Sequence, residues 1–147
     1  GMIGGAILAG APEVTVASLR KLGENMGPAF QIRDDLIDLT VGKGRGGIKG
    51  SDIREGKASI LYAHALAHSM PEECEQLVEI MGKPREATTE EDVATVLALY
   101  ERCGSLEFAR QTADRLIRQA LDTLASIPSE QRTALEPLVR YMVERTT

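Results

Sequence analysis

The sequence predicts an all-α protein, a single helical bundle over residues 1–147. First, apolar residues recur at the spacing of one helix face, and no run alternates polar and apolar residues as a half-buried strand would. Second, glycine and proline fall between these periodic stretches, where helices begin and end. Third, apolar residues make up 43% of the chain and charged residues 27%, which are the proportions of an ordinary globular domain.

The expected helices follow these breaks along the chain. The first ends before Pro12, and a long second helix follows, in which Gly23, Gly27 and Pro28 can cause a bend or a division. Later helices are bounded by a proline, a glycine or a threonine cap. The expected ranges are about 1–10, 13–40, 55–70, 72–81, 90–103, 105–126 and 129 onward.

Four polar residues of the second helix share one of its faces. Gln31, Asp34, Asp35 and Asp38 stand at i, i+3, i+4 and i+7, within an arc of roughly 100°. Each pair of like charges four residues apart costs roughly 0.2–0.5 kcal/mol, and the C-terminus of a helix disfavours negative charge. A bound cation would relieve both penalties, so this face is a candidate metal site. The alternative is an acidic face that is only solvated.

A basic, glycine-rich segment follows these carboxylates. Residues 42–50 read Gly-Lys-Gly-Arg-Gly-Gly-Ile-Lys-Gly, so Lys43 and Lys49 can neutralise an anion that the glycine backbone approaches closely. Next to three carboxylates, such a segment suits a polyphosphate bridged by divalent cations. The alternative is an ordinary loop in solvent.

Asp52 and Lys57 form a third element of the candidate site. Asp52 and Glu55 have the spacing of a capping box that would start the third helix, and direct binding of a substrate is the other interpretation of Asp52. Lys57 would then lie in or near the first turn of that helix. A cation is unfavourable there unless an anion is close.

These three elements together resemble a known family. The pattern Gln31-x-x-Asp34-Asp35-x-x-Asp38, the Gly/Lys loop and Gly50-Ser-Asp-Ile-Arg-Glu-Gly-Lys57 resemble, in order and spacing, the second aspartate-rich region of the trans-isoprenyl diphosphate synthases, or polyprenyl synthetases. The likeness continues through residues 104–113, 120–130 and 135–145, and covers essentially the whole chain. The first aspartate-rich motif of the family, its arginine pair and its Lys-Thr pair are absent. We therefore expect the C-terminal half of such an enzyme, as a fragment or as a half-length relative.

The resemblance implies the all-α isoprenoid synthase fold and a prenyltransferase that condenses an allylic diphosphate with isopentenyl diphosphate. In that family Mg²⁺, held between two aspartate motifs, assists departure of the allylic diphosphate. By this comparison Asp34 is the main metal ligand and a catalytic residue. Asp35 and Asp38 bind the metal or its waters.

The same comparison assigns the residues that bind substrate. Lys57 is a catalytic, diphosphate-binding residue, and Gln31 orients the metal shell. Many family members have Gly-Lys-Pro where this chain has Gly-Gly-Ile at 46–48. Lys43 or Lys49 would have to supply the missing lysine. Because the opposing aspartate motif is absent, we expect the isolated chain to be inactive.

Other functional classes remain open. A non-catalytic subunit of a heteromeric prenyl synthase could keep this fold and pair with a catalytic partner. A class I terpene cyclase would share the helical architecture, but its Asn/Ser/Glu metal triad is not evident. His64 and His68 are one turn apart, a spacing that can hold zinc, although the sequence offers no third ligand nearby.

Charge and hydropathy restrict the partners. A net charge of −5 argues against nucleic acid, and no apolar run approaches the roughly 18–20 residues of a membrane-spanning helix. We expect a cytoplasmic protein that is not integral to the membrane. Helix surfaces that would contact the missing N-terminal half favour a homo-oligomer or pairing with that half.

Overall fold

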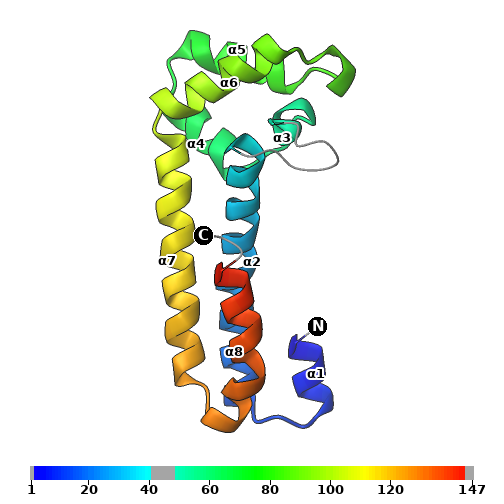
Figure 1. Cartoon of the computed structure of the whole chain (residues 1–147), viewed down its shortest axis with the longest axis vertical. Coiled ribbons are helices and arrows are strands. Elements are labelled where there is room, and N and C mark those ends of the chain that lie inside the picture. Colours follow the sequence, from blue (N-terminus) through cyan, green and yellow to red (C-terminus); the bar gives the residue numbers. More distant parts are fainter. Residues whose placement is uncertain (1, 41–48, 145–147) are drawn as a thin grey trace. The chain divides into compact units, whose positions relative to one another are not determined.

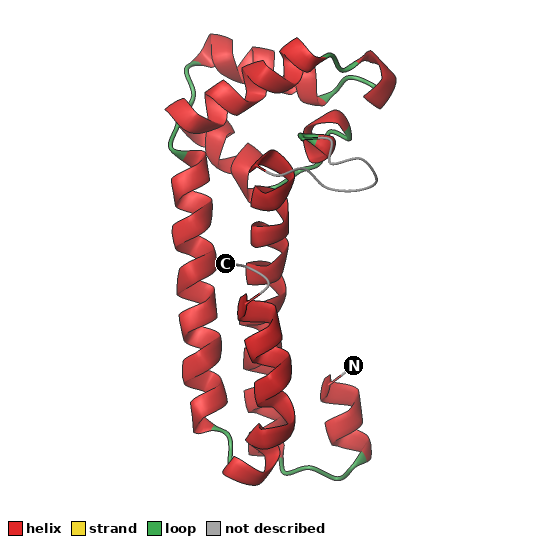
Figure 2. Ribbon diagram, in the orientation of Figure 1, coloured by secondary structure: helices red, strands yellow, loops and turns green. Residues whose placement is uncertain are grey.

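The computed structural model describes residues 2–40 and 49–144, and the regular elements in these ranges are all helical (Figure 1; Figure 2). The expected all-α class is confirmed. The elements are α1 (Met2–Leu8), α2 (Glu13–Thr40), α3 (Ser51–Arg54), α4 (Ile60–His68), α5 (Pro71–Met81), the 3₁₀ turn η1 (Arg85–Ala87), α6 (Glu90–Arg102), α7 (Ser105–Ser126) and α8 (Ser129–Glu144).

The chain divides into two compact units. Unit 1 comprises residues 1–31 and 112–147, and unit 2 comprises residues 32–111. The helices α2 and α7 each contribute residues to both units. The expectation of a single domain over 1–147 stays a prediction.

Unit 1 is held together by apolar side chains of α2, α7 and α8. Its buried cluster comprises Leu19, Leu22, Met26, Ala120, Leu124, Ile127 and Val139. Ile3 and Ala6 of α1 and Leu135 of α8 pack against this cluster. Pro28 lies inside α2 without ending it. The packing of this apolar helix face therefore compensates for the backbone hydrogen bond that a proline removes.

Unit 2 is built from short helices with well-defined starts. Within it α4, α5 and α6 contact one another, and α3 contacts α6. The Ser59 hydroxyl accepts a hydrogen bond from the Tyr62 N–H at the start of α4, and Thr89 forms a capping box with Asp92 at the start of α6. Pro71 occupies the first position of α5, where its missing N–H costs nothing. The largest fully buried apolar side chains of this unit are Leu61, Leu77, Val96 and Tyr100.

The expected start of the third helix near Glu55 is wrong, and so is the expected capping role of Asp52. The short α3 begins at Ser51, with Gly50 as its N-cap residue, and Asp52 lies inside it. The next helix begins only at Ile60, so Lys57 lies in the segment that joins α3 and α4. The cause is the backbone at two glycines: Gly50 has φ +72° and Gly56 has φ +60°, values that turn the chain out of a right-handed helix.

No helix in the described ranges is both long enough and apolar enough to cross a membrane.

Candidate functional site

The last turns of α2 and the start of α3 are joined through Asp38. Its carboxylate Oδ2 accepts a hydrogen bond from the Asp52 N–H at 2.9 Å, and its backbone carbonyl accepts one from the Gly50 N–H at 3.1 Å. The Asp38 side chain is fully buried. At Gly50 a Cβ would lie 2.5 Å from Val93 Cγ1, so the approach of this turn to α6 requires glycine. Asp38 therefore fixes where α3 begins.

Lys57 joins two carboxylates from different elements. Its Nζ lies 2.6 Å from Asp35 Oδ1 on α2 and 2.9 Å from Asp52 Oδ2 on α3. Asp35 is 4% exposed, whereas about a third of the Lys57 side chain is exposed. Partial burial by itself would lower the pKa of Lys57, but the hydrogen bonds to Asp35 and Asp52 outweigh it and raise the pKa above its usual value. The amine is thus held as a cation, on a side chain that is about one third exposed.

Gly56 brings Lys57 to this position. With φ +60°, its backbone lies in the left-handed region, and a Cβ there would be 2.4 Å from the Met81 carbonyl oxygen. Any other residue would have to push α5 away.

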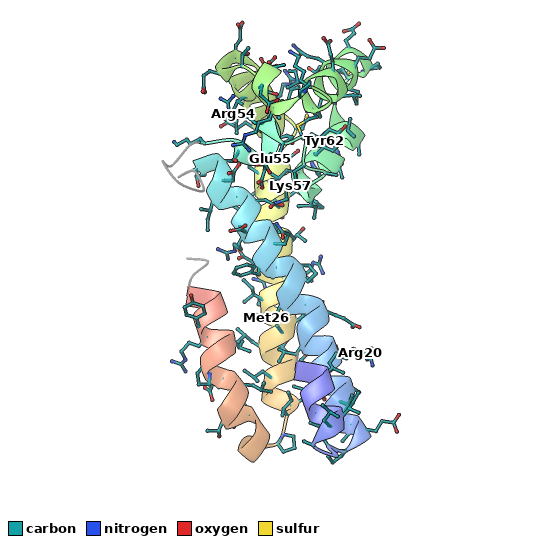
Figure 3. All side chains as sticks on the ribbon, turned by 90° about the vertical axis from the view of Figure 1, so that its right-hand side faces the viewer. Arg20, Met26, Arg54, Glu55, Lys57 and Tyr62 are labelled. Carbon is teal, nitrogen blue, oxygen red and sulfur yellow. The ribbon has the colours of Figure 1, made fainter. Side chains whose placement is uncertain are left out.

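Ion pairs hold α3 to the corner formed by η1 and α6. Arg54 Nη1 donates to the Thr88 carbonyl at 2.6 Å, and Arg54 Nη2 lies 2.5 Å from Glu90 Oε1. Arg85 pairs with Glu55 on the same surface. Figure 3 shows Arg54, Glu55 and Lys57 in this part of unit 2. The segment that carries Lys57 is therefore anchored at its N-terminal side.

A small cavity is lined in part by Lys57, Asp35 and Asp52, here called the Lys57 cluster. Its lining residues are Asp35, Leu39, Asp52, Ile53, Lys57, Ser59, Leu61, Met81 and Tyr100. Burial raises the pKa of the Tyr100 phenol, while a hydrogen bond with the Ser59 side chain opposes the rise. Tyr100 is therefore a neutral phenol over the physiological pH range.

The remaining candidate residues are not among those that contact Lys57. Asp34 is half-buried, one residue before Asp35, and Gln31 is exposed and falls in unit 1. Lys49 is exposed in the turn before Gly50, and Lys43 lies outside the described residues. The structure thus brings together Asp35, Asp38, Asp52 and Lys57.

The two histidines form an aromatic stack in unit 2. The ring of His64 lies 4.0 Å from that of His68 and 4.2 Å from that of Phe108, between centroids. His64 Nδ1 is 3.0 Å from the Ser105 hydroxyl, and His68 Nδ1 is 2.8 Å from the His64 carbonyl oxygen. One nitrogen of each ring is thus engaged within the protein. Burial, and then the neighbouring His68, lower the pKa of His64.

Comparison with known proteins identifies the family. Residues 2–100, about two thirds of the chain, match the polyprenyl synthetase family. The chain belongs to the polyprenyl synthetases. It is 32% identical to the geranylfarnesyl diphosphate synthase of Natronomonas pharaonis over 143 residues, which are 96% of this chain and 40% of that protein. It is 33% identical to the octaprenyl diphosphate synthase of Escherichia coli, covering 95% of this chain and 43% of the other.

Solved structures of polyprenyl synthetases are similar to this chain. A geranylgeranyl pyrophosphate synthase of Corynebacterium glutamicum, complexed with isoprenyl diphosphate and magnesium, superposes with a TM-score of 0.78 at 33% identity, covering 96% of this chain and 40% of that one. A decaprenyl diphosphate synthase of Rhodobacter capsulatus gives a TM-score of 0.78 at 32% identity, covering 99% and 44%. The chain thus spans about two fifths of the length of the polyprenyl synthetases it matches.

The aspartate carboxylates of this chain are oxygen ligands, the type that Mg²⁺ prefers. Among the described residues no three His, Cys, Asp or Glu side chains converge as a ready-made metal site. Protein sites for Mg²⁺ do not need three: the ion is usually held by one or two carboxylates together with substrate phosphates and water. Asp34 is only half-buried and offers such a carboxylate. The assignment of Asp34, Asp35 and Asp38 to a metal stays a prediction.

Sequence reasoning missed several residues that shape this site. Gly50 and Gly56 set the turns around α3, and Arg54 anchors it. Ser59 and Tyr100 line the same cavity as Lys57. Of these, Ser59 carries a local signal, because a serine before a run of helix-forming residues is a common N-cap. Tyr100 lies about forty residues away from Lys57 in sequence, and no local pattern links the two.

Proposed function

We propose that this chain supplies the second aspartate-rich half of a polyprenyl diphosphate synthase active site. The complete site would condense an allylic diphosphate with isopentenyl diphosphate. The observation that supports the proposal is the position of Lys57: its Nζ contacts both Asp35 and Asp52, and about a third of its side chain is exposed. The family and the named activities of the relatives support it.

Lys57 is suited to bind a diphosphate. An ammonium group has three N–H donors, and two of them are directed to Asp35 and Asp52. The third can donate to a phosphate oxygen. The two carboxylates keep the amine charged and hold it in one orientation. The Lys57 side chain therefore needs little reorganisation when a diphosphate binds.

The aspartates take different parts in this proposal. Asp34 would hold Mg²⁺, which when bound supplies positive charge to the departing diphosphate. Asp35 orients Lys57, and the buried Asp38 holds the start of α3. Gln31 orients the metal ligands around Asp34. Lys43 or Lys49 places a further positive charge beside the diphosphate.

Calorimetric titration with inorganic pyrophosphate in the presence of MgCl₂ tests these assignments. We expect Asp34→Asn and Lys57→Gln each to weaken binding at least about tenfold, because charge-assisted contacts contribute roughly 1.5–3 kcal/mol. Asp122→Asn and Lys21→Gln are matched controls on exposed positions of unit 1. Equal losses from site and control variants would show that the acidic face of α2 is only solvated.

Catalysis by the isolated chain tests a second consequence. We expect no prenyl elongation when the chain is incubated with Mg²⁺, isopentenyl diphosphate and a labelled allylic diphosphate, since it lacks the family's first aspartate-rich motif. Clear elongation by a protein of verified mass would overturn this expectation. It would require a complete site, for example in a homo-oligomer.

A non-catalytic subunit is the second candidate function. Such a subunit could keep this helical fold and pair with a catalytic partner. In that case Asp34→Asn would leave the activity of the assembled enzyme unchanged, whereas the first proposal predicts a large loss.

A further inference from the structure

The short helix α3 carries Asp52 and leads directly into the segment of Lys57. The Lys57 N–H donates a hydrogen bond to the Asp52 carbonyl oxygen at 3.0 Å, so the backbone of Lys57 continues the last turn of α3. A helix of four residues has little stability of its own. The position of Lys57 therefore depends on the contacts that hold α3 to the rest of unit 2.

The two ends of α3 are held by different contacts. At its start, α3 is bonded to the Asp38 carboxylate. Its last residue is Arg54, whose guanidinium reaches the corner between η1 and α6. There Nη1 of Arg54 donates to the Thr88 carbonyl oxygen at 2.6 Å, and Nη2 lies 2.5 Å from Glu90 Oε1. Arg54 thus restrains the end of α3 that is nearer to Lys57 in sequence.

The Thr88 carbonyl is a fixed acceptor. Thr88 is buried, its N–H donates to the Arg85 carbonyl oxygen at 3.3 Å, and its hydroxyl donates to the Pro84 carbonyl oxygen at 3.2 Å. The capping box that starts α6 follows directly. The Glu90 side chain is 89% exposed, and an ion pair with so exposed a partner contributes little. The bond to the Thr88 carbonyl is therefore the contact through which Arg54 holds α3.

We propose that Arg54 is a positioning residue for diphosphate binding: by holding the end of α3 to the Thr88 carbonyl, it fixes the backbone from which the Lys57 amine reaches the diphosphate. This inference rests on the proposed function, because it concerns the same diphosphate site. Arg54 binds no substrate in this proposal. Its effect is on where the Lys57 amine lies before the diphosphate binds, since a long, flexible side chain keeps one geometry only if its backbone is fixed.

The first measurement follows the Lys57 ammonium group in the 147-residue chain by ¹⁵N nuclear magnetic resonance. Arg54→Met keeps an unbranched side chain and removes every N–H donor. We expect the Lys57 signal to move toward the shifts of exposed lysines and its N–H exchange with water to become several times faster. Arg102→Met is the matched control, because it makes the same change at the other end of α6 and breaks the ion pair with Glu73. It should leave the Lys57 signal in place.

Arg54→Gln is the second variant at this position. Its amide group stands nearer the backbone than the guanidinium nitrogens do, so it also loses the bond to the Thr88 carbonyl, but it keeps a polar side chain. We expect the same movement of the Lys57 signal as in Arg54→Met. Arg54→Gln decides the question if Arg54→Met does not fold.

The second measurement is calorimetric titration with inorganic pyrophosphate in the presence of MgCl₂. Arg54→Met should weaken binding by roughly two- to tenfold, the range expected when one long side chain has to be ordered on binding. Arg102→Met should bind like the parent. Melting temperatures of the same samples show the loss of stability in each variant, so a weaker binding that follows stability alone would appear in the control as well.

The outcomes separate this inference from the proposed function. An unchanged Lys57 signal in the Arg54 variants overturns the positioning role, and so does a signal that moves as far in Arg102→Met. A signal that moves in the Arg54 variants alone, in a chain whose Lys57 never responds to pyrophosphate, supports the positioning of Lys57 by Arg54 and overturns the proposed function.

Discussion

Units 1 and 2 are stabilised by different kinds of contact. Unit 1 rests on apolar side chains such as Leu22 and Leu124, spaced along helices of 16 to 28 residues. Unit 2 contains a four-residue helix that is held by Asp38, Arg54 and two glycines with positive φ. Apolar packing tolerates small shifts of the packed side chains, whereas hydrogen bonds and close backbone contacts fix the orientation of the groups that make them.

This difference has a functional meaning. A site that binds diphosphate needs its donors within a fraction of an ångström of their working positions. The residues that achieve this lie in unit 2, around Lys57. Substitutions in the apolar cluster of unit 1 should therefore change stability alone, and substitutions in the segment around Lys57 should change both stability and the geometry at Lys57.

The largest expected effect is that of Leu22→Ala in unit 1. Leu22 is 1% exposed within the apolar cluster, and truncating such a leucine costs about 2–5 kcal/mol of the free energy of unfolding. Urea denaturation measures this loss. Leu121→Ala, at a position that is 42% exposed, is the control and should cost far less. The Lys57 resonance should be unchanged in both folded variants, and a shift in Leu22→Ala would contradict the division of roles.

A smaller expected effect is that of Gly56→Ala in unit 2. A non-glycine residue at this φ costs about 1–3 kcal/mol, and the added Cβ would collide with the Met81 carbonyl. Gly23→Ala in α2, where no atom lies within 4 Å of the added Cβ, should instead stabilise by about 0.5–1 kcal/mol. Thermal unfolding shows whether each substitution stabilises or destabilises the protein. A Gly56→Ala variant at least as stable as the parent would show that the turn at Gly56 is not as described.

The smallest effect is a pH dependence from His64 in unit 2. Its pKa is below the usual 6.5, so the unfolded chain binds more protons than the folded one between the two values. The contribution of His64 to the free energy of unfolding is complete above about pH 6.5. It is lost as the pH falls through the pKa of His64 in the folded chain. His64→Gln should flatten this part of the profile of unfolding free energy against pH. If the parent and His64→Gln profiles run parallel, His64 is not the group responsible.

Sequence periodicity was sufficient for the long helices. The expected range 105–126 agrees with α7 (Ser105–Ser126), and 72–81 differs from α5 (Pro71–Met81) by one residue. In each case the helix is defined by local signals: an apolar face, a proline at the start, or a glycine after the end.

The site could be predicted only in part. The spacing of Asp34, Asp35 and Asp38 indicated one helix face. It did not indicate that Asp35 and Asp38 are buried while Asp34 is half-buried, because this depends on contacts with α3 and Lys57. The length of α3 depends on the backbone angles at Gly50 and Gly56 and on bonds that span more than ten residues. No pattern in a short window encodes such contacts.

The central claim is that Lys57 and Asp34 together receive a metal-bound diphosphate. A crystal structure of the chain with pyrophosphate and Mn²⁺, located by its anomalous signal, tests it most directly. We predict the metal ion on the Asp34 carboxylate and a phosphate oxygen within about 3 Å of Lys57 Nζ. A metal bound elsewhere, with Lys57 contacting only Asp35 and Asp52, would contradict the claim.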